Sequence, residues 1–190
     1  MNIPFDITGI TIRTGRLLLR PWQAEDLDDL YEYASVDGVG QMAGWKPHSS
    51  KEESAEILKM FIAGKKTFAL EYQGKVIGSL GIEQYDEKQA AELNDFKGRE
   101  IGYVLAKDYW GRGLMPEAVR AVIDWMFEHT DIDFLTCGYF VHNRQSKRVQ
   151  EKCGFHFLKY IEFETILGTT EKTSLNILYR SDWQKAKGRE

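Results

Sequence analysis

Two glycines separated by one residue, Gly111 and Gly113, lie in the segment 108–115 (DYWGRGLM), between an expected strand and an expected helix. Glycine lets the backbone adopt positive φ angles, so such a turn can direct several N–H groups inward. The helix that follows adds unpaired N–H groups and the positive end of its dipole. The chemistry that this segment predicts is the binding of a phosphate group.

The residues after these glycines do not fit the two common nucleotide-binding motifs. A P-loop continues with Gly-Lys-Ser/Thr, whereas Gly113 is followed by Leu114 and Met115. The dinucleotide fingerprint needs a third glycine, and the chain has Pro116 there. Proline is tolerated in the first turn of a helix, so we expect the helix to begin near Gly113 or Leu114. The amides facing an anion are then those from Trp110 to Met115. The alternative is a turn that only reverses the chain.

Composition and charge exclude several classes of protein. The chain has 190 residues and a formal net charge of −4, with a pI near 5.7, and we expect one domain over residues 1–190. Its basic residues are scattered among 29 acidic ones, which argues against a nucleic-acid partner. The densest basic cluster is expected on one helix, as a solvated face or a local anion site. This cluster consists of Arg144, Lys147, Arg148 and Lys152.

Cysteine and histidine usage argues against a metal site or a disulfide scaffold. Cys137 and Cys153 are in no paired metal-ligand spacing, and the four histidines are scattered. The first residues have no basic region followed by an apolar core, and no apolar run is long enough to span a bilayer. We therefore expect buried thiols, no metal, no membrane partner and a cytoplasmic location.

Hydrophobic periodicity predicts strands and helices that alternate in the order βαα, βββ, α, β, α, ββ. The expected strands are 16–20, 67–72, 76–84, 100–107, 134–141, 155–165 and 173–180. The expected helices are 24–34, one capped by Ser50, 114–128 and 146–153. The helix 114–128 has only one narrow polar stripe, so it should be covered on most sides. This order indicates a layered α/β or α+β domain in which the phosphate turn lies where a strand gives way to a helix.

The segments 14–21 (TGRLLLRP), 108–113 and 143–146 (NRQS), with the later pair Gly154 and Phe155, resemble the GNAT superfamily of acyl-CoA-dependent N-acetyltransferases. The resemblance is to the branch of ribosomal-protein N-terminal alanine and serine acetyltransferases (the Rim type) and extends through Asp182 and Trp183. It implies the GNAT fold, a mixed and mostly antiparallel sheet of about seven strands flanked by about four helices and splayed between its fourth and fifth strands.

The resemblance implies acetyl-CoA as the cosubstrate, with its pyrophosphate on the turn and its pantetheine arm in the splay, and no metal. The implied cofactor-binding residues are Val104, Leu105, Trp110, Gly111, Arg112, Gly113, Leu114, Met115 and Asn143. The chain departs from the family pattern at two positions. Asp108 stands where many members have Gln or Arg, and we expect its carboxylate to point away from the phosphates. Gln150 stands where many members have the tyrosine that protonates the leaving thiolate.

Acetyl transfer needs a deprotonated amine, a polarised thioester carbonyl and a proton for the departing sulfur. Glu100 matches the catalytic glutamate of some members, and we expect it to accept the amine proton directly or through water. A strand-end carboxylate in solvent, or paired with Arg99, is the alternative. Ser146 is the expected hydrogen-bond donor to the thiolate, and a helix N-cap is its alternative role.

The loop 38–50 is expected to form a wall of the acceptor site, with Trp45 and His48 as candidate substrate contacts. The predicted function is direct acetyl transfer onto a primary amine, with a protein N-terminus among the candidate acceptors. A polyamine, an amino sugar or an antibiotic amine is the alternative acceptor. A non-catalytic acyl-CoA sensor and a dinucleotide-dependent oxidoreductase are alternative functions. The expected partner is the amine acceptor. The chain is expected to be either a monomer or a homodimer.

Overall fold

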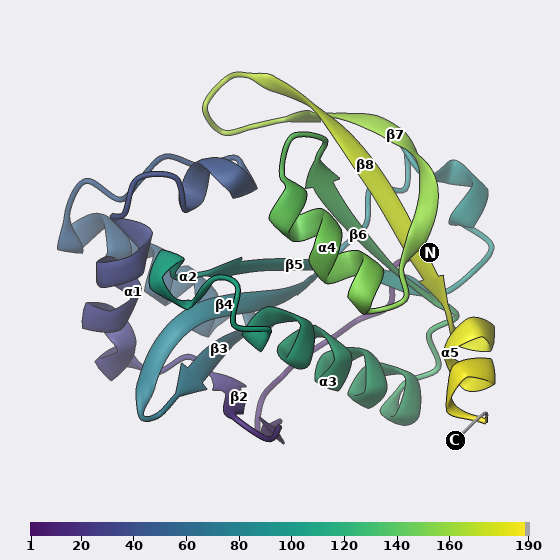
Figure 1. The fold of residues 1–190 in the computed structure, drawn as a ribbon, viewed down its shortest axis with the longest axis horizontal. Helices are drawn as coiled ribbons and strands as arrows, with labels where there is room; N and C mark the ends of the chain where they lie inside the picture. The colour runs from purple at the N-terminus through teal and green to yellow at the C-terminus, as the bar shows by residue number, and fades with distance from the viewer. Residues whose placement is uncertain (189–190) are drawn as a thin grey trace.

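The computed structural model describes residues 1–188, which form one mixed sheet of eight strands with helices on both faces (Figure 1). The strand order is β1-β2-β3-β4-β5-β6-β8-β7. The strands are β1 (Ile12–Arg13), β2 (Leu17–Pro21), β3 (Thr67–Tyr72), β4 (Lys75–Glu83), β5 (Gly98–Leu105), β6 (Phe134–Phe140), β7 (His156–Glu164) and β8 (Thr170–Tyr179). The helices are α1 (Leu27–Ala34), α2 (Lys51–Gly64), α3 (Leu114–His129), α4 (Arg144–Lys152) and α5 (Arg180–Lys187). Short 3-10 turns include η2 (Gly40–Ala43) and η4 (Lys107–Tyr109).

Two apolar layers hold the helices to the sheet. The larger one packs α3 against β2, β4, β5 and β6, and its fully buried members include Val122 and Leu80. The second packs α1 and α2 against β3 and β4 around Trp22 and Leu58. Figure 1 shows α1 and α2 at one end of the molecule, and α3 and α4 in front of the sheet. The predicted layered domain is confirmed, and α3 is covered along most of its length because only a narrow stripe of it is polar.

The sequence signals for the helix starts are confirmed for two of the helices. The Ser50 side chain accepts a hydrogen bond from the Glu53 amide at 3.2 Å and caps α2. The helix α3 begins at Leu114, with Pro116 in its first turn. The sheet has one strand more than expected, because the two-residue β1 is too short to show periodicity. The helix α5 was also missed, because its strongly polar sequence buries no residue.

The two central strands β5 and β6 run parallel but pair over only three residues. The pairs are Gly98 with Phe134, Arg99 with Leu135, and Glu100 with Thr136. Beyond Glu100, β5 is paired only with β4, and beyond Thr136, β6 is paired only with β8. The predicted splay between the fourth and fifth expected strands therefore lies between β5 and β6.

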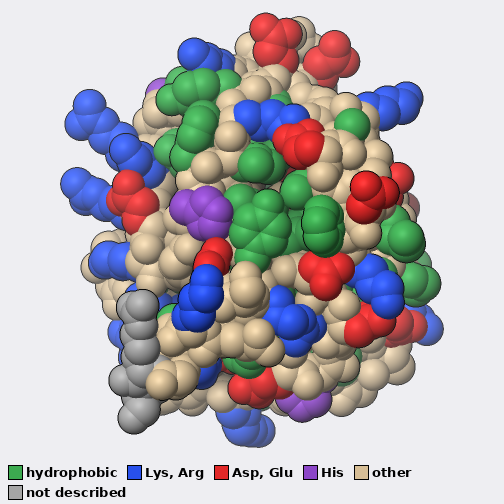
Figure 2. All heavy atoms as spheres, turned by 90° about the vertical axis from the view of Figure 1, so that its right-hand side faces the viewer, with side chains coloured by type: hydrophobic (Ala, Val, Ile, Leu, Met, Phe, Trp, Pro, Cys, Tyr) green, Lys and Arg blue, Asp and Glu red, His purple; other side chains and the backbone are tan. Residues whose placement is uncertain are grey.

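The strand β7 forms one edge of the sheet and leaves aromatic side chains exposed. Phe157 and Tyr160 are 54% and 57% exposed, and their ring centroids are 4.9 Å apart. Figure 2 views the molecule from the side on which β7 and α5 lie, and apolar side chains gather there among charged ones. The charged side chains of Lys159 and Glu162 interrupt this edge, which discourages unregulated pairing with other strands.

The guanidinium of Arg180 fastens the end of α3 to the start of α5. It donates hydrogen bonds to the carbonyl oxygens of Ile132 and Thr130, each at 2.7 Å, and to that of Phe127. These carbonyls lie at or just after the end of α3, where the helix has no N–H donors left to bond them. Arg180 therefore satisfies the end of the helix that is opposite the phosphate turn.

We expect Arg180→Met to lower the free energy of unfolding by about 2–3 kcal/mol, because it removes hydrogen bonds from a charged donor. Chemical denaturation measures this change. Lys185→Met is the control, since the exposed Lys185 contacts Asp182 at 3.5 Å and such pairs contribute about 0.5 kcal/mol or less. Equal stability of the two variants would contradict the role given to Arg180.

Candidate active site

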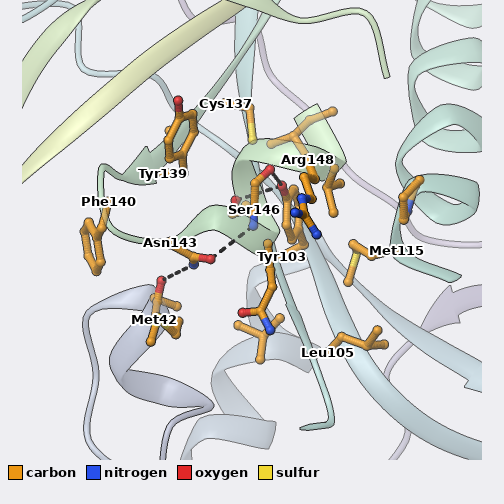
Figure 3. Close-up of a pocket in the computed structure, with 18 of the residues that line it drawn as sticks. Met42, Tyr103, Leu105, Met115, Cys137, Tyr139, Phe140, Asn143, Ser146 and Arg148 are labelled. Carbon is orange, nitrogen blue, oxygen red and sulfur yellow. Dashed lines mark hydrogen bonds between the residues drawn. The ribbon is translucent and has the colours of Figure 1, made fainter. Parts of the chain in front are cut away.

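A cleft of about 630 Å³ occupies the splay between β5 and β6. Its walls come from both strands, from the turn that precedes α3, from the start of α4 and from η2 (Figure 3). One end is formed by Trp110, Gly111, Gly113 and the first residues of α3. The other end contains Glu83 and Glu100, and about 17 Å of extended strand separates Glu100 from the end of β5. The two carboxylates therefore lie at the opposite end of the cleft from the turn and the N-terminus of α3.

At the turn, both glycines adopt the left-handed conformation that their positions suggested. The φ angles of Gly111 and Gly113 are both 75°. Within residues 1–188, the amides from Gly111 to Met115 have no hydrogen-bond partner. The Trp110 amide, which we expected to face an anion, instead donates to the Lys107 carbonyl at 3.1 Å because η4 uses it to close a turn. Five free amides and the α3 dipole form a site for an anion.

The side chains of the turn brace it from outside the cleft. The indole nitrogen of Trp110 donates to the Leu105 carbonyl at 2.7 Å. The guanidinium of Arg112 lies 5.0 Å from the centre of the Tyr109 ring, and the Arg112 carbonyl accepts from Arg16 at 3.0 Å. The Arg112 side chain is absent from the cleft lining, as is that of Asp108. The backbone of the turn, rather than its charged side chains, faces the cleft.

Two basic side chains of α4 line the cleft near the turn. All four residues of the predicted cluster are exposed, and Arg148 and Lys152 line the cleft, whereas Arg144 and Lys147 do not. Val104 and Leu105, at the end of β5, provide the apolar wall between this basic end and the acidic one.

At the acidic end, Glu100 lies at the last register pair before the splay. One of its carboxylate oxygens accepts from the Thr136 hydroxyl at 3.4 Å. Burial raises the pKa of Glu100 to about 7, and the nearby Glu83 adds to this increase, while the Thr136 hydrogen bond opposes it. Arg99 points elsewhere and makes no ion pair with Glu100 in the residues that the structure describes. Glu100 can therefore exchange a proton near neutral pH.

Asn143, and not Ser146, caps α4. The Asn143 side-chain oxygen accepts from the Ser146 amide at 3.0 Å, so the helix begins at Arg144, earlier than the predicted 146. The Asn143 amide group donates to the Met42 carbonyl at 3.3 Å and thereby ties η2 to α4 (Figure 3). Because Asn143 has taken the capping role, the Ser146 hydroxyl is available for other contacts.

The hydroxyl of Ser146 lies 2.9 Å from that of Tyr103, which also donates to the Ser146 carbonyl at 3.2 Å (Figure 3). An aromatic residue in a strand usually fills a core, so periodicity alone gives Tyr103 no role beyond packing. The side-chain amide of Gln150 donates to the Gly138 carbonyl at 3.0 Å and lies 3.4 Å from the Ser146 hydroxyl. Ser146 and Gln150 are neighbours on α4, but no local sequence signal relates them to Tyr103 or Gly138, which belong to separate strands.

Trp45 and His48 belong to the loop 38–50 but do not line the cleft. The His48 ring contacts the Ser54 hydroxyl at 2.7 Å, and its centroid is 5.2 Å from that of Trp45. Burial lowers the pKa of His48. Val39 and Met42 of the same loop line the cleft instead. The predicted loop therefore contributes to the cleft, but through other residues than Trp45 and His48.

The remaining walls of the cleft are mostly apolar. Phe163 and Phe140 approach the position where a Gly44 side chain would begin, at 3.3 and 3.4 Å, so the hairpin β7–β8 and the η2 loop close on each other. These apolar residues include Val39, Met42, Phe140, Ile161 and Phe163.

No group of three potential ligand side chains that could hold a metal ion occurs in residues 1–188. No helix in these residues is long and apolar enough to cross a membrane.

Comparison with known proteins adds a family to this geometry. Residues 16–156 match the family described as "Acetyltransferase (GNAT) domain". A putative ribosomal N-acetyltransferase of Bacillus subtilis, YdaF, is 26% identical over 156 residues, which cover 77% of each chain. A GNAT-family acetyltransferase structure from Bacillus anthracis superposes with a TM-score of 0.77 at 21% identity, over 90% of this chain and 99% of that one. The acetyltransferase MccE, solved with acetyl-CoA and AMP, has a TM-score of 0.72 at 15% identity, over 87% and 93%.

The raised pKa of Glu100 predicts a pH-dependent difference between the wild type and Glu100→Gln. Between the ordinary pKa of 4.5 and about 7, the folded state binds the Glu100 proton more tightly than the unfolded state. Its contribution to stability is therefore lost as the pH rises through about 7. We expect the Tm of E100Q, relative to the wild type, to increase from pH 5 to pH 8. Glu162→Gln, an exposed position, controls for the lost charge, and a Tm difference that stays constant for E100Q would contradict the assignment.

Proposed function

The chain belongs to the GNAT acetyltransferase family, and from that premise we propose that it transfers an acetyl group from acetyl-CoA directly to a primary amine. The observation that carries this proposal is the cleft with five free amides at one end and a carboxylate of raised pKa at the other. The first end suits the phosphates of CoA, and the second suits an ammonium group that must lose a proton.

The residues at the turn fit the pyrophosphate of CoA. Each N–H to phosphate hydrogen bond contributes about 1.5–3 kcal/mol, and the amides from Gly111 to Met115 are free to make such bonds. Arg148 and Lys152 add positive charge beside it. We assign the apolar wall at Val104 and Leu105 to the pantetheine arm, because a narrow slot between two separated strands accommodates an extended chain.

Glu100 is the proposed base. The amine nitrogen attacks the thioester carbon, the C–N bond forms, the C–S bond breaks and its electron pair goes to sulfur. The ammonium nitrogen loses two protons in all. Glu100 accepts one of them, the sulfur gains one from the solvent pool, and one proton is released overall. Ser146 is the proposed donor of a hydrogen bond to the departing sulfur, because its hydroxyl lines the cleft and the capping role belongs to Asn143.

The pKa of Glu100 favours an α-amine as the acceptor. An α-ammonium has a pKa of about 8, about one unit above that of Glu100, whereas a lysine-like amine has a pKa of about 10.4. Each unit costs about 1.4 kcal/mol, so Glu100 deprotonates the α-amine more easily. The apolar wall at Met42 and Phe163 also provides apolar contacts for the first side chains of a peptide. We propose a protein N-terminus as the acceptor.

A panel of acetyl acceptors tests the function through release of free thiol from acetyl-CoA. We expect the highest kcat/KM for short peptides with a free N-terminal alanine or serine, and lower values for a polyamine and an amino sugar. Glu100→Gln should still be stabilised thermally by acetyl-CoA but should lose a hundredfold or more in turnover, about the contribution of a general base. Thermal stabilisation of the wild type without thiol release on any acceptor would indicate a sensor rather than an enzyme. A preference for the polyamine would refute the proposed acceptor.

Alanine substitutions at Gly111 and Gly74, two glycines with similar positive φ angles, should differ in their effect on acetyl-CoA binding. Gly111 and Gly74 have φ angles of 75° and 80°, and a methyl group at either would meet nothing within 4 Å. Alanine should destabilise both sites by about 1 kcal/mol. Only Gly111→Ala should weaken acetyl-CoA binding, by tenfold or more, because a relaxed backbone there turns amides away from the phosphates. Calorimetric Kd values measure this, and equal Kd values for the two variants would contradict backbone recognition.

A further inference from the structure

A hydrogen bond crosses the cleft where the strands have separated. The Tyr103 hydroxyl extends from β5 and lies 2.9 Å from the hydroxyl of Ser146, the third residue of α4 (Figure 3). β5 and β6 no longer pair at this level, since their last register pair is Glu100 with Thr136. Tyr103 therefore holds the start of α4 at a fixed distance from the opposite wall.

The second neighbour of the Ser146 hydroxyl has a fixed orientation. The Gln150 side-chain oxygen accepts from the Asn176 amide group at 2.6 Å, and its nitrogen donates to the Gly138 carbonyl at 3.0 Å. The side-chain amide of Gln150 cannot be turned round without losing both bonds. Gln150 therefore presents an N–H group, and not an oxygen, to the Ser146 hydroxyl 3.4 Å away.

These contacts determine where the hydroxyl hydrogen of Ser146 can point. A serine hydroxyl accepts two hydrogen bonds and donates one. The Gln150 N–H group takes one acceptor site. The single hydrogen of the Tyr103 hydroxyl can go to the Ser146 carbonyl, at 3.2 Å, or to the Ser146 hydroxyl oxygen, at 2.9 Å. In the second and shorter arrangement it takes the other acceptor site of the Ser146 hydroxyl. Ser146 makes no hydrogen bond to a carbonyl of the preceding turn among the residues described. Its one hydrogen is then free to point into the cleft that it lines.

We propose that Tyr103 is a positioning residue, which aims the Ser146 hydroxyl hydrogen at the sulfur that leaves during acetyl transfer. The inference rests on the proposed function, because it requires a departing thiolate. Neither hydroxyl gives up its proton. The C–S electron pair goes to sulfur, Ser146 stabilises the negative charge by donating a hydrogen bond, and the sulfur takes its proton from solvent. Burial raises the pKa of Tyr103 well above its usual value, so the phenol remains a donor throughout.

This arrangement gives Gln150 a role that a tyrosine at its position could not fill. Gln150 is buried and fastens α4 to β6 through Gly138 and to β8 through Asn176. The phenol of this site comes from the opposite wall, on β5, and reaches the sulfur position through Ser146 rather than directly. Because position 150 holds a glutamine, the phenol that supports the Ser146 hydroxyl comes from β5 and not from α4.

The test is a double-mutant cycle with Tyr103→Phe and Ser146→Ala, measured on acetyl-CoA and the best peptide acceptor. We expect Y103F to lower kcat about tenfold while the KM for acetyl-CoA and its Kd stay within twofold. The double variant should match S146A, because Tyr103 acts only through Ser146. Tyr85→Phe is the matched control. It also removes a buried hydroxyl, which bonds to Leu93 and Asn94 outside the cleft, and it should leave kcat unchanged.

Several outcomes would overturn the proposal. The proposal fails if Y103F leaves kcat unchanged or only raises the KM. It also fails if the losses in Y103F and S146A multiply in the double variant. Replacement of Tyr103 by a ring-fluorinated tyrosine keeps the shape if Y103F fails to fold. Because fluorination lowers the phenol pKa, kcat should then fall at alkaline pH where the wild type does not, and absence of that fall refutes the idea. If the wild type releases no thiol with any amine, the proposed function fails instead.

Discussion

The separation of β5 from β6 after three register pairs is the constraint on which the rest of this structure depends. Each strand keeps a partner on its other side, β4 for β5 and β8 for β6, so the separation costs the sheet only the pairing between the two. The apolar layer under α3 holds both strands in place beneath the gap. A stable cleft can therefore exist in the middle of a sheet, where strands usually close against one another.

The charges at the two ends of this cleft follow from where it lies. Strand β5 leads directly into the turn and α3, so the helix N-terminus and its free amides meet the end of the cleft at Leu105. At the start of the splay, Glu100 lies between Glu83 of β4 and Thr136 of β6, and burial raises its pKa. An anion is favoured at one end, and a group that releases a proton is favoured at the other. In the function proposed above, this polarity would orient a long cosubstrate along the cleft.

The helix α4 connects the chemistry to the sheet. Asn143 caps it and bonds to η2, Gln150 fixes it to β6 and β8, and Tyr103 bonds to it from β5. Three walls of the cleft thus meet at one short helix, on which Ser146 is held. The Ser146 hydroxyl is oriented by hydrogen bonds with Tyr103 and Gln150, and the sequence around Ser146 gives little sign of them. Buried polar networks of this kind stay ordered only when their members are satisfied.

The sequence alone determined the features that depend on local chemistry. Glycine spacing and Pro116 predicted the turn and the start of α3, Ser50 predicted a cap, and apolar periodicity predicted the order of the long elements, because each is set by residues within one or two turns of the chain. Only the tertiary structure decided that Trp110 uses its amide internally, that Met42 rather than His48 faces the cleft, and that Tyr103 meets Ser146. Those contacts join residues from separate elements, and their positions depend on how the strands twist and part.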